Sequence, residues 1–203
     1  VLENRFNKLI EARHGTILYN KNDIYIGKSI EKYGEFSYLE AKIFEQICKA
    51  GDVVIEVGAN IGAHTLYLSK LVGNGFVFAF EPQRLVFQNL CANLALNSIS
   101  NVFAYQEAVS NENGTIIIPE CNFKENNNFG GINIENTKNG TTVNKQKLDN
   151  FLNKIDRLKL LKIDVEGMEI LVIKGAKELI DKFRPIIYIE NDKLDEAEIF
   201  FPT

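Results

Sequence analysis

The chain has 203 residues and a formal net charge of -4, with 45% hydrophobic and 25% charged residues. This length and composition predict one globular domain with a buried core, and the acidic balance argues against nucleic acid as the main partner. No apolar run approaches the roughly 18 residues needed to cross a bilayer, and charges interrupt the N-terminus, so we expect neither membrane insertion nor a signal peptide.

Cysteine usage indicates a reducing compartment. Cys48, Cys91 and Cys121 are odd in number and share no close spacing. A disulfide framework or a zinc cluster is therefore not expected, and the pattern favours a cytoplasmic protein.

The N-terminal quarter predicts a hairpin followed by a helix. Apolar and polar residues alternate on both sides of "NKND" within residues 15–35, which is typical of a β-hairpin. Residues 37–51 show helical apolar spacing, with Ser37 as N-cap, Glu40 three positions later and Gly51 as a stop. We expect residues 1–50 to pack on a core formed by residues 51–203, as one domain overall.

Strands and helices alternate through the rest of the chain. Apolar runs predict strands at 52–58, 75–82, 101–110, 158–167 and 184–192, with helices at 63–72, 83–98, 146–155 and 168–183, the last broken at Gly175. Residues 114–120 and part of an Asn-rich insert, 121–142, are interpreted as small extra strands. The alternation predicts an α/β fold with a doubly wound, mainly parallel sheet.

Polar and acidic residues follow the predicted core strands. In doubly wound sheets, ligands bind beyond the carboxyl ends of the strands. The residues at those ends are Glu56 to Asn60, Glu81 and Pro82, Glu107 and Ala108, Asp164 to Glu166, and Glu190 to Asp192.

The turn "EVGANIG", residues 56–62, lacks the G-x-G-x-x-G pattern that places a pyrophosphate on a helix N-terminus. A ligand with a cationic end instead of phosphates fits an acid beside the turn. Glu56 is a candidate partner for an ammonium group of the ligand, with a Lys or Arg of the protein as the alternative partner. Glu81 is a candidate partner for two ribose hydroxyls. S-adenosylmethionine (SAM) offers both features. The predicted cofactor-binding residues of this region are Glu56, Gly58, Ala59, Asn60, Gly62, Glu81 and Pro82. The alternative for Gly58 and Gly62 is a purely structural role, in which they permit a tight turn and close packing of the following helix.

Four segments together resemble the FkbM family of SAM-dependent methyltransferases: "VVIEVGANIGAHTLYLSK", "VFAFEPQ", "LKIDVEGMEILVIKGA" and "RPIIYIEND". The resemblance covers the chain from about Arg13 to Asp192. It implies a Rossmann-like class I methyltransferase fold and O-methylation of a hydroxyl on a sugar, glycolipid or secondary metabolite, with Glu107 and Ala108 bordering the adenine.

The sequence departs from the family pattern at two places. Glu56 stands where Asp is commoner, which changes the reach of the side chain but not its charge. Methyltransferases of this fold usually add an antiparallel strand pair after the fifth strand, whereas this sequence stops at Thr203. The resemblance thus leaves open a shortened sheet or a truncated chain.

The segment "KIDVEG" carries the predicted chemistry. Methylation of an alcohol needs a base near the methyl group, and Asp164, followed by Glu166, is the candidate. An alternative is a Mg²⁺ site formed by Asp164, Glu190 and Asn191, which resembles the catechol-type O-methyltransferases. We expect Lys162 to point away from this edge, although a lysine base stays open, and we interpret His64 as a packing residue.

Two other classes of function remain compatible with the sequence. One is an NAD-dependent oxidoreductase on a similar sheet, against which the missing middle glycine counts. The other is a non-catalytic SAM-binding protein, against which the acids at all five strand ends count. The expected partner is a small-molecule or glycan acceptor.

Overall fold

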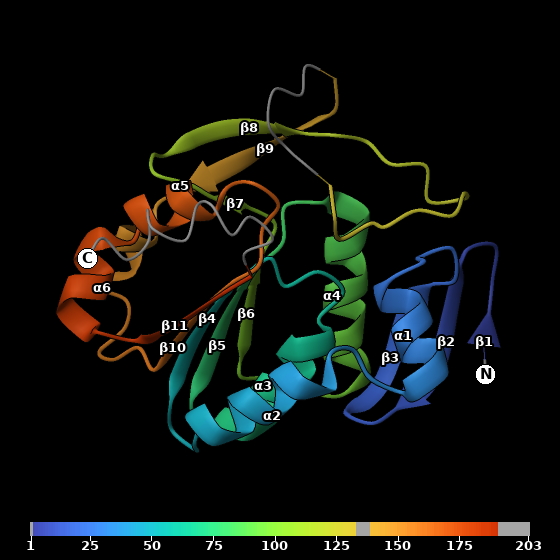
Figure 1. Ribbon diagram of the computed structural model, residues 1–203, viewed down its shortest axis with the longest axis horizontal. Coiled ribbons are helices and arrows are strands. Elements are labelled where there is room, and N and C mark those ends of the chain that lie inside the picture. Colours follow the sequence, from blue (N-terminus) through green and yellow to red (C-terminus); the bar gives the residue numbers. More distant parts are fainter. Residues whose placement is uncertain (1, 133–138, 191–203) are drawn as a thin grey trace.

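A parallel five-stranded sheet forms the centre of the computed structural model, which describes residues 2–132 and 139–190 (Figure 1). Its strands are β4 (Val53–Val57), β5 (Phe76–Phe80), β6 (Val102–Tyr105), β10 (Leu160–Ile163) and β11 (Ile186–Ile189). They are ordered β11-β10-β4-β5-β6, and every neighbouring pair is parallel. The predicted α/β fold class and all five core strands are confirmed.

Helices cover both faces of this sheet. Val54 and Val77 face α2 (Tyr38–Ile47) and α3 (Ala63–Val72), and α4 (Arg84–Leu96) packs on the same side. Ile55 and Phe78 face the 3₁₀ helix η1 (Leu148–Phe151) together with α5 (Glu169–Lys174) and α6 (Lys177–Phe183). Burial on both faces explains why the core strands are continuous apolar runs. None of the helices in the described residues is both long and apolar enough to span a membrane.

The N-terminal region differs from the predicted hairpin. An antiparallel sheet contains β1 (Leu2–Glu3), β2 (Asn7–Ala12) and β3 (Gly15–Asn20). Its strand β3 pairs with β2, which precedes it in the chain, and not with the residues that follow it. The second predicted arm is instead the helix α1 (Ile26–Tyr33). Ile26 and Ile30 lie four residues apart and are both buried on one helical face, which the alternating pattern concealed. Gly34, at φ 72°, ends the helix.

Asn93 of α4 and Asn97, the C-cap residue of that helix, attach the N-terminal sheet to the core. The amide of Asn93 accepts a hydrogen bond from Leu18 N at 2.6 Å and donates to Leu18 O at 3.0 Å and Ile61 O at 2.8 Å. Asn97 repeats the exchange with Thr16, at 2.9 and 2.7 Å. These side chains satisfy the backbone of β3 as another strand would, which stabilises its position beside α4.

Helix α2 begins where predicted, with Ser37 at the N-cap. The Ser37 hydroxyl, however, donates to the carboxylate of Glu40 at 2.5 Å instead of capping a backbone N–H, and the helix ends at Ile47, before Gly51.

A second small sheet follows β6, with strands β7 (Ala108–Val109), β8 (Gly114–Ile118) and β9 (Thr141–Gln146) in the order β7-β9-β8. The helix predicted over 146–155 is wrong, because β9 extends to Gln146 and only η1 follows. The strand predicted at 114–120 is confirmed. Residues 133–138 of the insert, and any strands after residue 190, lie outside the described residues.

The ends of β4 and β10 approach each other too closely for a side chain at Gly58. Asp164 N donates to Val57 O at 3.0 Å, which continues the strand pairing to the carboxyl edge. Gly58 follows with φ 84°, and a Cβ there would lie 1.8 Å from the carbonyl oxygen of Asp164. A glycine is therefore required at position 58 by the close approach of the two backbones. The same approach holds Asp164 beside the turn that follows β4.

We predict that Gly58→Ala lowers the free energy of unfolding by about 3 kcal/mol or more, because backbone atoms must move and a left-handed φ must be held. Gly34→Ala is the matched control: its φ is 72° and the nearest atom to its Cβ is 3.7 Å away. The control should cost only about 1 kcal/mol in urea denaturation. Equal losses in the two variants would contradict the close approach.

Candidate active site

A pocket opens at the carboxyl edge of the central sheet. One wall comes from the residues after the strands: Gly58, Asn60, Glu81, Asp164, Glu166 and Glu190. The other wall comes from the N-terminal segment and the Asn-rich insert: Tyr25, Ile26, Phe36, Asn128, Gly130 and Gly131. Four carboxyl groups thus line a single pocket, as the strand-end pattern predicted, and the described lining includes no Lys or Arg.

The turn after β4 is held by backbone hydrogen bonds. Gly58 N and Ala59 N both donate to Phe80 O, at 3.0 and 2.9 Å. Asn60 has a left-handed φ of 51°, and its side-chain oxygen accepts from Ile61 N at 2.8 Å. Gly62, at φ 85°, is the N-cap of α3, and a Cβ there would lie 2.6 Å from Leu90 Cδ1. Of the predicted residues in this turn, Gly58 and Asn60 line the pocket, whereas Ala59 and Gly62 pack inside the fold.

Glu81 closes the end of β5 and is 3% exposed. Its carboxylate accepts hydrogen bonds from Asn60 N at 3.0 Å and from Gln83 N at 2.8 Å. Burial raises the pKa of Glu81 to about 7, against the two backbone amides that lower it. Two oxygens with about four acceptor positions can accept further donors beside these amides, so the group remains able to bind hydroxyls.

Lys162 lies between two acids, contrary to the expectation that it points away from the edge. Its ammonium is 2.8 Å from Asp164 Oδ2 and 3.9 Å from Glu56 Oε1, and the side chain is 1% exposed. Lys162 and Glu56 are register partners on neighbouring strands, and Asp164 follows two residues later on the same face. The strand periodicity of two could have revealed that Lys162 and Asp164 share a face, whereas the pairing with Glu56 depends on the register between β10 and β4.

Glu56 lies behind the pocket wall instead of lining it. The carboxylate accepts a hydrogen bond from the Thr65 hydroxyl at 2.6 Å and faces Lys162. Burial raises the pKa of Glu56 to about 7, although Lys162 and Thr65 act in the opposite direction. The interpretation of Glu56 as a partner for a ligand ammonium therefore gives way to pairing within the protein.

Lys162 and Asp164 keep their charges. Burial disfavours the Asp164 carboxylate, but the Lys162 ammonium and a hydrogen bond with Glu190 outweigh it and hold the pKa of Asp164 below its usual value. Burial likewise favours a neutral Lys162, yet Asp164 and Glu56 together raise its pKa. The pair presents a carboxylate to the pocket.

His64 supports the packing interpretation. It lies 5.5 Å from the ring of Phe36 and 5.3 Å from that of Phe44, and its Nδ1 is 3.7 Å from the carboxylate of Glu40. Burial lowers the pKa of His64 to about 3, so the ring is neutral at physiological pH.

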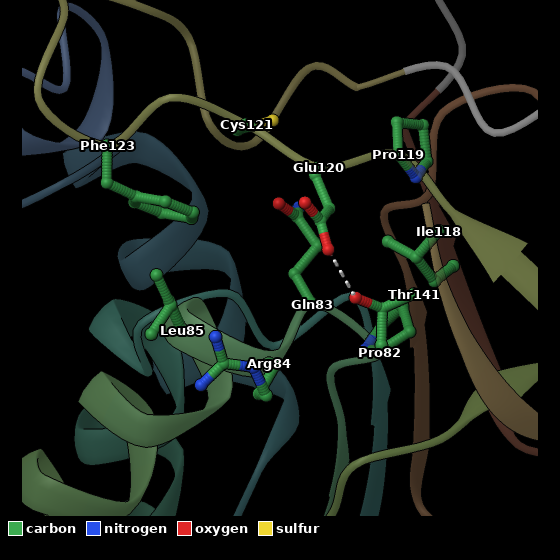
Figure 2. Close-up of a pocket in the computed structure, with 10 residues that line it drawn as sticks. All are labelled: Pro82, Gln83, Arg84, Leu85, Ile118, Pro119, Glu120, Cys121, Phe123 and Thr141. Carbon is green, nitrogen blue, oxygen red and sulfur yellow. Dashed lines mark hydrogen bonds between the residues drawn. The ribbon is translucent and has the colours of Figure 1, made fainter. Parts of the chain in front are cut away.

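The predicted adenine residues lie apart from the pocket. Glu107 accepts a hydrogen bond from the side-chain amide of Gln146, and Ala108 is buried in β7 beside β9. Pro82 instead lines a second cavity, next to Glu81 in the chain (Figure 2). Apolar side chains of this cavity include Pro82, Leu85, Ile118 and Phe123, while Gln83, Glu120 and Thr141 supply polar groups.

The proposed metal set is only partly described. Asp164 and Glu190 both line the pocket, but Asn191 lies outside the described residues. Within residues 2–132 and 139–190, no three His, Cys, Asp or Glu side chains are grouped to hold a metal ion. The Lys162 ammonium also occupies the position beside Asp164 that a cation would take.

Comparison with known proteins agrees with this geometry. A family model described as the methyltransferase FkbM domain matches residues 56–200, well over half of the chain. The chain belongs to the FkbM methyltransferase family. The resemblance noted in the sequence is confirmed, and the acid-lined pocket lies within the matched FkbM segment, apart from Tyr25, Ile26 and Phe36.

Individual relatives are similar at low identity. The chain is 27% identical over 181 residues to the methyltransferase sdnD of Sordaria araneosa, covering 71% of this chain and 70% of that protein. It is 27% identical over 150 residues to the hexuronic acid methyltransferase AglP of Haloferax volcanii, covering 73% of this chain and 59% of AglP, which is less than two thirds. A SAM-dependent methyltransferase from Aquifex aeolicus shows a TM-score of 0.42 and 20% identity, covering 75% of this chain and 66% of that one.

The raised pKa of Glu81 predicts a pH-dependent stability. A carboxyl group with a folded-state pKa near 7 and an ordinary value of 4.5 contributes stability below 4.5 that is lost as the pH rises through 7. Between about pH 5 and about pH 8, this effect should lower the free energy of unfolding of the wild-type protein by on the order of 3 kcal/mol. Glu81→Gln should abolish that decrease, because the amide does not titrate.

Urea denaturation at both pH values measures the effect. Glu125→Gln, a substitution of an exposed acid in the insert, is the control and should leave the pH dependence unchanged. If Glu81→Gln shifted the stability equally at both pH values, a raised pKa of Glu81 would be refuted.

Proposed function

We propose that the protein is a SAM-dependent methyltransferase that methylates a hydroxyl oxygen on a sugar, a glycolipid or a secondary metabolite. The observation that carries the proposal is the charged Asp164 carboxylate at the strand edge, held by Lys162 beside the Gly58 turn and across the pocket from an N-terminal wall. Membership of the FkbM family supports the reaction class.

The described residues fit SAM. SAM supplies an activated methyl group on a sulfonium cation, and a pocket lined by four carboxyl groups favours a cation. Glu81 would accept the ribose hydroxyls, since it already faces the pocket and retains acceptor capacity. The cavity beside Pro82 and Leu85, which has both apolar and polar lining groups, would suit a flat base better than Glu107 and Ala108, because those residues bond within the protein (Figure 2).

Asp164 would accept the proton of the acceptor hydroxyl. A base must be ionised before it can take a proton, and Lys162 keeps Asp164 in that state. Lys162 itself cannot serve as the base, because its two acidic neighbours keep it protonated. Glu166 lies on the same wall and is placed to accept a second hydroxyl of the acceptor, which orients it.

A Mg²⁺ site at Asp164 does not fit the described residues. The Lys162 ammonium already compensates this carboxylate at 2.8 Å, and a divalent cation there would meet it at close range. We therefore assign deprotonation to the carboxylate, and activity should persist after exhaustive chelation.

Asp164→Asn should lower turnover at least about a hundredfold while changing the affinity for S-adenosylhomocysteine (SAH) less than about threefold, because the amide keeps the shape but cannot accept a proton. Turnover is measured as mass gain of one methylene unit across a panel of hydroxyl compounds, and SAH binding by calorimetry. Asp181→Asn, an exposed position in α6, is the control.

Each outcome separates the candidate functions. Undiminished turnover in Asp164→Asn would remove Asp164 as the base. SAH binding without methylation of any compound would favour a non-catalytic SAM-binding protein, and heat with NAD but not with SAH would favour an oxidoreductase.

A further inference from the structure

The pocket has a second wall opposite the strand ends. It comes from two segments outside the central sheet, the start of α1 with Phe36 and the insert around Asn128. The donor would use Gly58, Asn60 and Glu81 on the strand side. The opposite wall therefore faces the space in which an acceptor must approach Asp164.

This wall is held in place before any ligand binds. Ile24 N donates to Asn127 O at 3.1 Å, and Asn127 N donates to Asn22 O at 3.0 Å. The Gln83 side chain donates to Phe129 O at 2.8 Å, which ties the insert to the turn after β5. Because the insert is bound to both the N-terminal segment and the core, its residues can position a ligand at low entropic cost.

The glycines of the insert bring it close to the strand edge. A Cβ at Gly130 would lie 3.0 Å from Asn60 Nδ2, and a Cβ at Gly131 would lie 3.3 Å from Glu166 Oε1. Larger residues here would narrow the pocket at the point where Asn60 and Glu166 meet the insert. The pocket thus has two walls at a fixed, short separation.

The chemistry of this wall is aromatic and amide. Tyr25 is 60% exposed, although it lies edge-on to Phe36 with ring centroids 5.8 Å apart. The side-chain oxygen of Asn128 accepts from Gly130 N and Gly131 N, at 3.2 and 3.1 Å, which leaves its NH₂ group as a donor. An exposed aromatic face and a fixed amide suit a ring that carries both C–H and hydroxyl groups.

The acidic residues of the strand-side wall favour an uncharged ring over an anionic one. Carboxylates accept hydrogen bonds from hydroxyls, but an anionic substituent would meet acids on this wall, and no Lys or Arg of the described lining could pair with it. An acceptor that carries a carboxylate is therefore disfavoured, because it meets repulsion and finds no Lys or Arg among the described lining residues.

We propose that Tyr25, Phe36 and Asn128 form the acceptor subsite, and that it takes an uncharged, hydroxyl-bearing ring of the sugar or cyclitol class. The ring packs its C–H face on Tyr25, the Asn128 amide donates to one ring oxygen, and the hydroxyl to be methylated points to Asp164. This inference rests on the proposed function and narrows it to neutral rings.

Matched ligands test the charge preference. Saturation-transfer NMR on the SAH-saturated protein compares methyl β-D-glucopyranoside with methyl β-D-glucuronoside, and the galactose pair in the same way. We expect signals from the neutral glycosides that exceed those from their uronate partners by at least about fivefold. Equal or stronger signals from the uronates, or none from either neutral glycoside, would overturn the proposal.

Substitutions test the residues. Tyr25→Ala should lower the neutral-glycoside signal at least about fivefold, whereas Tyr25→Phe should keep most of it, because the ring face remains. Tyr33→Ala is the control, since Tyr33 is equally exposed at the other end of α1 and does not line the pocket. An undiminished signal in Tyr25→Ala would reject Tyr25 as part of the subsite.

Calorimetry with SAH distinguishes the two levels of the account. SAH should bind wild-type and Tyr25→Ala proteins with the same affinity, because the variant leaves the strand-side wall intact. Absence of SAH binding to the wild-type protein would contradict the proposed function itself. Normal SAH binding without the glycoside preference would contradict only the acceptor subsite.

Discussion

A buried ammonium between two carboxylates organises the active end of this protein. Lys162 is 1% exposed and lies 2.8 Å from Asp164 and 3.9 Å from Glu56. Burying such charges costs several kcal/mol each unless they are paired, so the three groups depend on one another. The same interaction sets the state of the site, since it keeps Asp164 ionised at the edge where a ligand would bind. Stability and the proposed role of Asp164 as a base therefore rest on one arrangement.

The strands create this arrangement through their register. Glu56 of β4 and Lys162 of β10 are paired residues, and the turn at Gly58 lets the Asp164 backbone approach to within contact of β4. Val54 and Leu160, which precede Glu56 and Lys162 by two residues on the same strands, belong to an apolar cluster on the same face of the sheet. A charged side chain in an apolar layer can bond only to the few polar groups within its reach, so Lys162 is restricted to one geometry between Glu56 and Asp164. The N-terminal segment and the insert then add the opposite wall of the pocket.

Much of the fold could be predicted from the sequence, because the core strands are continuous apolar runs and α3 and α4 keep a clear helical period. The errors arose where two patterns coincide. Ile24, Ile26 and Ile30 fit both an alternating strand and a helical face, and the partner of β3 precedes it in the chain, so residues 26–33 were assigned wrongly. At 146–155, parallel pairing with β7 extended β9 through Gln146 and overrode helical spacing.

The candidate site was predictable to a similar extent. Strand ends identified Gly58, Asn60, Glu81, Asp164, Glu166 and Glu190, which the structure gathers around one pocket. Spacing could not show that Glu56 pairs internally, nor that Tyr25, Phe36 and Asn128 cross from distant segments, because those contacts depend on tertiary packing. Lys162 was recoverable, since strand alternation places it on the same face as Asp164.

The protonation state of Asp164 tests the central interaction most directly. A ¹³C NMR titration of its side-chain carboxyl, assigned with Asp164→Asn, should show no protonation step in the wild-type protein between about pH 5 and about pH 9. In the Glu56→Gln/Lys162→Met variant, which removes the ammonium without leaving Glu56 unpaired, the carboxyl should titrate inside that range, because the largest effect that opposes burial is then gone. Protonation of Asp164 within the range in the wild-type protein, or no difference between the two proteins, would contradict the account.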